Sequence, residues 1–90
     1  MPEQAKRVRN YSQRDKSVVS YWKHKESGEW YIYFPDGKGD GLCGGLANHK
    51  VEEHEDGTIS VTPSIQTWSA GESRESGRHG YLIKGIWSEC

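Results

Sequence analysis

Large aliphatic side chains are scarce in this sequence. Leucine, isoleucine, valine and phenylalanine make up 14 of its 90 residues, a share close to that of disordered chains. The formal net charge is only -1, however, and ten residues are aromatic. Because each aromatic ring can bury roughly 150–250 Å², we expect one small folded domain whose thin core is built on aromatic residues.

Long apolar runs are also missing. The first ten residues, MPEQAKRVRN, lack the apolar stretch of a secretory signal. No window approaches the length of a membrane span. We therefore expect a cytoplasmic protein with no membrane partner.

The sequence contains only two cysteines, Cys43 and Cys90. Free thiols are the ordinary state of cysteine in the reducing cytosol. A disulfide between the two and a metal site are the alternatives.

Charge is unevenly spread along the chain. Residues 1–25 carry seven basic and two acidic side chains, whereas residues 26–90 carry five basic and eleven acidic ones. Residues 1–16 show no helical stripe, so we expect a flexible basic arm ahead of a β-rich domain over residues 17–90. This arm is either a solvated terminus or a contact for nucleic acid, made by Lys6, Arg7, Arg9, Arg14 and Lys16.

Short β-rich runs alternate with glycine-containing turns. Residues 17–25 and 30–34 flank a turn signal and predict a hairpin. The alternation of side chains gives the core face to three of the apolar residues, Trp30, Ile32 and Phe34. Tyr31 and Tyr33 then share the other face, where a hydroxyl can reach water.

Asp56-Gly57 is the strongest short hairpin signal in the chain. A two-residue turn would pair an acidic residue with Val61, whereas a three-residue loop with a bulge at Gly57 pairs Val51 with Val61. We favour the second register because it keeps apolar residues together. Pro63 cannot donate to a ladder, so the second strand should end there or lie at an edge.

The rest of the chain predicts a return to the core at Ile65 and Trp68, a mobile polar loop over 69–77, and a closing hairpin of residues 79–83 and 86–87. Residues 42–48 are too rich in glycine to assign. The predicted fold is all-β, or β-rich α+β: a small single-domain antiparallel sandwich or roll of hairpins.

Three constellations are candidates for chemistry. Zinc is the one cofactor that the sequence suggests, through a Cys2His2 set that lacks a Cys-x-x-Cys pair: Cys43, His49, His79 and Cys90. Ser64 and His79 are the candidates for a nucleophile and its base, although no hydrolase signature surrounds them. The acidic side chains of one hairpin tip are either solvated or contact a protein partner: Glu52, Glu53, Glu55 and Asp56.

Aromatic residues next to the basic arm form a further candidate surface. Trp22, Tyr31 and Tyr33 have the ingredients of a partner-binding patch. Together with the arm they also have those of a sheet that stacks single-stranded bases. The acidic remainder of the chain argues against nucleic acid, because it repels phosphate.

The second half of the chain resembles a family of small phage and prophage proteins, some of which carry the label ammonia monooxygenase. The resemblance covers residues 42–90 and rests on the Pro-Ser-Ile strand at 63–65 and the later segments HGYLI (79–83) and GIW (85–87). It implies a zinc site at Cys43, His49 and His79, and a peptidase-like role for Ser64 and His79. The first cysteine of the family's Cys-x-x-Cys pair is absent here.

These observations favour a phage-type accessory protein that acts by binding a host protein, as an inhibitor or anti-defence factor. One alternative is a zinc-binding or peptidase-like domain. The other is nucleic-acid binding through the basic arm and the aromatic hairpin.

Overall fold

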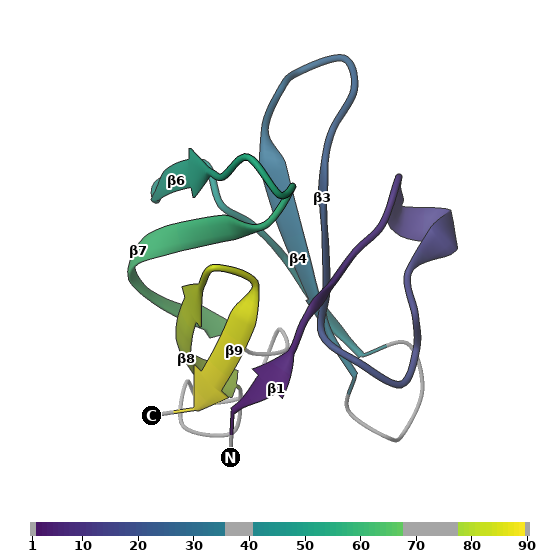
Figure 1. Ribbon diagram of the computed structural model, residues 1–90. Helices are drawn as coiled ribbons and strands as arrows, with labels where there is room; N and C mark the ends of the chain where they lie inside the picture. Colours follow the sequence, from purple (N-terminus) through teal and green to yellow (C-terminus); the bar gives the residue numbers. More distant parts are fainter. Residues whose placement is uncertain (1, 36–40, 68–77, 90) are drawn as a thin grey trace.

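The computed structural model describes residues 2–35, 41–67 and 78–89 and is built from two β-sheets (Figure 1). The described elements are β1 (Glu3–Gln4), β2 (Lys6–Arg7), the 3-10 helix η1 (Tyr11–Gln13), β3 (Ser20–Lys23), β4 (Trp30–Phe34), β5 (Leu42–Gly45), β6 (Lys50–Glu53), β7 (Ile59–Thr67), β8 (Arg78–Ile83) and β9 (Ile86–Glu89). The predicted all-β fold is confirmed. Trp68 and the predicted loop at 69–77 lie outside the described residues. Within the described residues, no helix is long and apolar enough to cross a membrane.

One sheet has the strand order β1-β9-β8-β7-β6, and the other has the order β2-β3-β4-β5. Every neighbouring pair is antiparallel except β2 and β3, which run parallel. Figure 1 shows β3 and β4 as one long hairpin that extends beyond the rest of the molecule.

The core lies between the sheets and contains many of the predicted aromatic residues. Its members are Ala5, Val19, Tyr21, Trp30, Ile32, Phe34, Leu46, Ile59, Val61, Ile65, Leu82 and Trp87. Trp30, Ile32 and Phe34 point inward as their alternation predicts. The rings of Phe34 and Trp87 join the two sheets, with 4.6 Å between centroids.

Both later hairpins follow their turn chemistry. Val51 pairs with Val61, which confirms the three-residue loop, and Gly57 has the positive φ of 89° that the bulge requires. Lys84 and Gly85 connect β8 to β9 with φ values of 49° and 77°, as in the two-residue turns that match strand twist.

The prediction that a strand ends or lies at an edge at Pro63 is wrong. Strand β7 continues through a cis Thr62-Pro63 peptide and lies between β6 and β8. Its register to β8 shifts between Val61 and Ile65. Pro63 lies at this irregularity, where the ladder does not need the N–H that proline lacks. Both of these residues still reach the core, and their burial favours continuing the strand.

Residues 3–7 differ from the predicted flexible arm. Strand β1 pairs with β9 in one sheet and β2 pairs with β3 in the other. Between them Ala5 is buried, and its N–H donates to the carbonyl of Gly85 at 2.8 Å. The small side chain of Ala5 allows the backbone to cross from one sheet to the other at this point.

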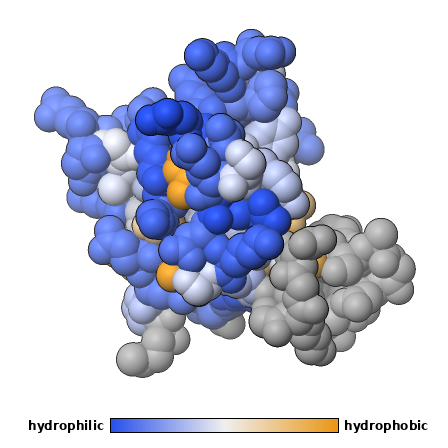
Figure 2. Space-filling view, turned by 90° about the vertical axis from the view of Figure 1, so that its right-hand side faces the viewer, coloured by the Kyte–Doolittle hydropathy of each residue, from blue (hydrophilic) through white to orange (hydrophobic). Residues whose placement is uncertain are grey.

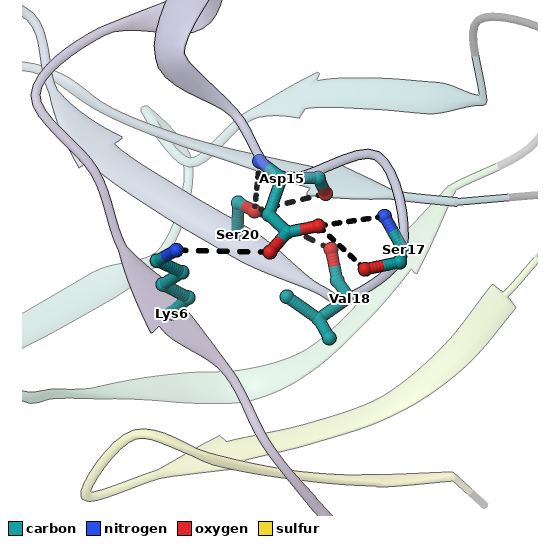
Figure 3. Close-up of polar contacts among 5 residues, drawn as sticks. All are labelled: Lys6, Asp15, Ser17, Val18 and Ser20. Carbon is teal, nitrogen blue, oxygen red and sulfur yellow. Dashed lines mark hydrogen bonds and ion pairs between the residues drawn. The ribbon is translucent and has the colours of Figure 1, made fainter.

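The chain then crosses the outer face of the second sheet through residues 9–17, which we call the cover segment. Asp15 anchors it (Figure 3): its carboxylate accepts from the Ser17 N–H at 2.9 Å and from the Ser17 hydroxyl at 2.5 Å, and pairs with Lys6 at 3.6 Å. The Asp15 N–H donates to the Ser20 hydroxyl at 3.2 Å. Hydrogen bonds from Ser17 lower the pKa of Asp15, and the charge of Lys6 adds to this effect.

We expect this anchor to weaken in acid. A lowered pKa stabilises the folded form above the ordinary value of 3.8, and the contribution is lost as the pH falls through the folded pKa. Backbone NMR shifts of Ser17 and its neighbours, followed from neutral pH to acid, should therefore titrate below this value. The transition should be absent in Asp15→Asn, and an identical transition in that variant would contradict the assignment.

Candidate nucleic-acid interface

Two adjoining grooves lie where the cover segment meets the tip of the β3–β4 hairpin. The first has a volume of about 730 Å³ and is lined by Arg7, Val8, Arg9, Lys23, His24, Lys25 and Gly28. The second has a volume of about 540 Å³ and is lined by Arg9, Asn10, Tyr11, Ser12, Trp22, Lys23, His24, Lys25 and Glu26. They share Arg9 and the three residues 23–25, so the same basic side chains border both.

Three of these basic side chains are available to a ligand. Arg9, Lys23 and Lys25 are exposed, and none of them pairs with a carboxylate in the described ranges 2–35, 41–67 and 78–89. The Lys23 ammonium lies 5.9 Å from the centre of the Trp30 ring, a contact that leaves its charge unneutralised. The grooves are therefore positive, with Glu26 as the one carboxylate among their lining residues.

Aromatic rings lie beside the grooves on the outer face of the second sheet. Trp22 and Tyr31 stack at 6.0 Å with 17° between their planes, and Tyr11 meets Trp22 edge-on at 5.9 Å. Tyr11 is 46% exposed, whereas Trp22 is 4% and Tyr33 is 1% exposed. The predicted patch of Trp22, Tyr31 and Tyr33 is thus assembled, but two of its three rings are buried, with Tyr11 of the cover segment against Trp22 and Arg14 over Tyr33.

The surface on this side is mostly hydrophilic. Figure 2 views the molecule from the side that carries η1 and shows a broad hydrophilic surface interrupted by small hydrophobic spots. This surface suits a charged ligand better than an apolar partner.

The structure separates the five basic residues predicted to contact nucleic acid. Lys6 pairs with Asp15, and Arg7 donates to Glu53 and to the Gly57 carbonyl, each at 2.9 Å. The other three are Arg9 in the grooves, Arg14 between two tyrosine rings and Lys16 with no ion pair in the described part of the chain. Sequence reasoning did not identify Lys23, His24 and Lys25 as site residues, because only the crossing of the cover segment turns the hairpin tip into the wall of a groove.

Ser64 and His79 are brought together. The Ser64 hydroxyl lies 2.9 Å from His79 Nε2 across β7 and β8, and His49 Nε2 donates to the Ser64 carbonyl at 3.2 Å. A catalytic pair also needs a group that orients the base. Within the described residues no carboxylate hydrogen-bonds the His79 ring, so the part of the chain that the structure describes supplies two of the three members of a nucleophilic site.

The predicted zinc ligands do not converge in the described part of the chain. Cys43 is exposed on β5, while His49 and His79 each contact Ser64, and Cys90 lies outside the described residues. Among the residues described, no group of three or more candidate ligands is positioned to hold a metal ion. Partial desolvation of its thiol by neighbouring atoms raises the pKa of Cys43, an effect that the charge of Arg14 partly offsets, and a raised pKa disfavours the thiolate that zinc requires.

The acidic hairpin uses part of its charge internally. Glu53 pairs with Arg7 at 2.9 Å, and the carboxylate of Asp56 accepts from the side chain and the backbone of Thr58 at 2.6 and 3.0 Å. The hydrogen bonds from Thr58 lower the pKa of Asp56. Glu52 and Glu55 are exposed, and a protein partner at this tip stays a prediction.

No family model matches the chain, and the searches of curated proteins and of solved structures found no significant match.

Proposed function

We propose that this protein binds single-stranded nucleic acid along the two grooves between the cover segment and the β3–β4 hairpin. The observation that carries the proposal is the convergence of Arg9, Lys23 and Lys25 around the grooves with no carboxylate partner among the described residues. Such side chains attract phosphates and release counterions when they bind them.

The aromatic neighbours favour a nucleic acid over an acidic peptide. Tyr11 lines the second groove and is 46% exposed, so its ring is open to a base. Stacking on an aromatic ring beside a basic groove is the usual way in which proteins hold single strands without sequence preference.

The charge of the remaining chain also favours the grooves as the binding site. Residues 26–90 carry six more acidic than basic side chains, and repulsion by these acids directs a polyanion toward the grooves.

The charge reversal Lys23→Glu/Lys25→Glu tests the proposal. Fluorescence anisotropy with a labelled oligo-dT strand of about 10 nucleotides measures the affinity. At low salt, the affinity of the double variant should be about 10–100-fold lower than that of the wild type. Both side chains are exposed, so the unfolding temperature should change little.

The matched control is Lys50→Glu/Lys84→Glu. It makes the same change in net charge at two exposed lysines that do not line the grooves. Its affinity should stay within about twofold of the wild type because its charges lie outside the contact. Equal losses in the two double variants would show attraction by net charge alone and would overturn the proposed site.

A further inference from the structure

The outer face of the second sheet carries three aromatic rings outside the hydrophobic cluster that lies between the sheets. Trp22, Tyr31 and Tyr33 lie on the face opposite Trp30 and Ile32, and the main hydrophobic cluster excludes them. Gly45 lies beneath Tyr31, with an added Cβ only 3.3 Å from the ring. The three rings therefore lie over two neighbouring strands, β3 and β4.

The cover segment lies over these rings. The η1 residues within it are not themselves buried. The Arg14 guanidinium is 3.9 Å from the centre of the Tyr11 ring and 5.1 Å from that of Tyr33, so it lies between them. The contact with Tyr11 involves an exposed ring, where cation–π contacts are weak, whereas the contact with Tyr33 involves a buried one.

Backbone hydrogen bonds attach the cover segment mainly near its ends. Val8 donates to Tyr21 at 2.9 Å just before it, and Asp15 donates to the Ser20 hydroxyl near its far end. Within residues 9–14, backbone hydrogen bonds run from Gln13 to Asn10 and from Arg14 to Tyr11, inside the segment itself. Its central part is therefore held over the sheet by side chains.

Two polar atoms, one of a covered ring and one of the cover segment, are buried with no hydrogen-bond partner among the described residues. They are the Tyr33 hydroxyl and Arg14 Nε. A buried polar group without a partner disfavours the state that buries it. The covered state thus carries a cost that uncovering the rings would relieve.

We infer that the cover segment is displaced when a single strand binds, and that Trp22, Tyr31 and Tyr33 are the platform on which its bases stack. This inference rests on the proposed function and specifies how the ligand is held. The strand first meets the grooves at Arg9, Lys23 and Lys25. Bases then replace Tyr11 and Arg14 against the rings, and the displaced segment presents Arg9, Arg14 and Lys16 to the phosphates. A segment that shields the rings in the free protein then also contributes charge to the complex.

Loosening the anchor tests this mechanism. Asp15→Ala removes the acceptor for Ser17 and the partner of Lys6, so uncovered molecules become more frequent. Because apparent affinity scales with the fraction of molecules able to bind, oligo-dT affinity should rise by about 3–10-fold. Without ligand, acrylamide should quench tryptophan fluorescence more strongly in Asp15→Ala than in the wild type.

A pair of substitutions at Tyr31 tests the platform itself. Tyr31→Phe keeps the ring and should keep the affinity within about twofold, whereas Tyr31→Leu removes the ring and should lower the affinity by about tenfold or more. Tyr81→Leu, an exposed tyrosine on the other sheet, is the control and should leave binding unchanged.

The outcomes separate this inference from the proposed function. If the wild type does not bind oligo-dT, the proposed function fails. If it binds, but Asp15→Ala binds equally or more weakly, or Tyr31→Leu binds as well as Tyr31→Phe, the ligand does not use the platform and the inference is overturned.

Discussion

Replacing Trp87 with alanine should destabilise the protein by about 3–5 kcal/mol. The side chain is fully buried, packs against Phe34 of the opposite sheet at 4.6 Å and donates from its indole nitrogen to Glu89 at 2.9 Å. Its removal leaves a cavity where the two sheets meet and takes a partner from Glu89. Urea unfolding followed by far-UV circular dichroism measures the loss.

The neighbouring Ser88→Ala is the control, since Ser88 is half-buried in the same strand and outside the core cluster. It should shift the free energy of unfolding by less than about 1 kcal/mol. Equal stabilities for Trp87→Ala and Ser88→Ala would contradict the placement of Trp87 in the core.

Replacing Gly80 with alanine should have the second large effect. A Cβ added at Gly80 would lie 2.1 Å from the carbonyl oxygen of Ser88 in the paired strand β9. Because the clashing atom belongs to the backbone, strands β8 and β9 must separate, at a cost of about 3 kcal/mol. Thermal unfolding of the purified variant measures the effect.

Gly45→Ala is the matched comparison for stability. An added Cβ there would lie 3.3 Å from the Tyr31 ring. A ring at the surface can shift by the few tenths of an ångström that relieve this contact. The cost should stay below about 1 kcal/mol. If Gly80→Ala unfolds at the same temperature as Gly45→Ala, the close approach of β8 and β9 is not as described.

The hairpins were predictable because their information is local. Asp56-Gly57 and Lys84-Gly85 determine turns over a few residues, and the pairing of Val51 with Val61 follows from keeping apolar residues opposite each other. Alternation likewise identified the inward face of β4. These features need no knowledge of distant parts of the chain.

The N-terminal segment was not predictable because its contacts are distant. Residues 3–7 contain few apolar side chains, and their strands form only because β9 and β3 offer free edges. Tyr33 is buried rather than wet, since Arg14 of the cover segment lies over its ring and Gly41 lies against its hydroxyl. The course of β7 through Pro63 depends on neighbours on both sides, which the local sequence does not show.

The candidate site was predictable in its ingredients and not in its arrangement. Basic residues near an aromatic hairpin pointed to nucleic acid, but Lys6 and Arg7 serve internal ion pairs. Lys23 and Lys25 replace them at the grooves, because charge counts along a chain do not show which cations lack partners. Ser64 and His79 do meet, although no carboxylate among the described residues contacts that histidine ring.

The most direct test of groove binding is a titration of the wild-type protein with labelled oligo-dT at several salt concentrations. Contacts from Arg9, Lys23 and Lys25 predict saturable binding. The logarithm of the association constant should fall with the logarithm of the salt concentration with a slope of about -2 from the groove contacts alone, and more steeply when the displaced cover segment adds Arg14 and Lys16. Polyglutamate of similar charge should compete weakly, because it has no bases to stack. No binding at low salt, or equal competition by polyglutamate, would contradict the assignment of these grooves to single-stranded nucleic acid.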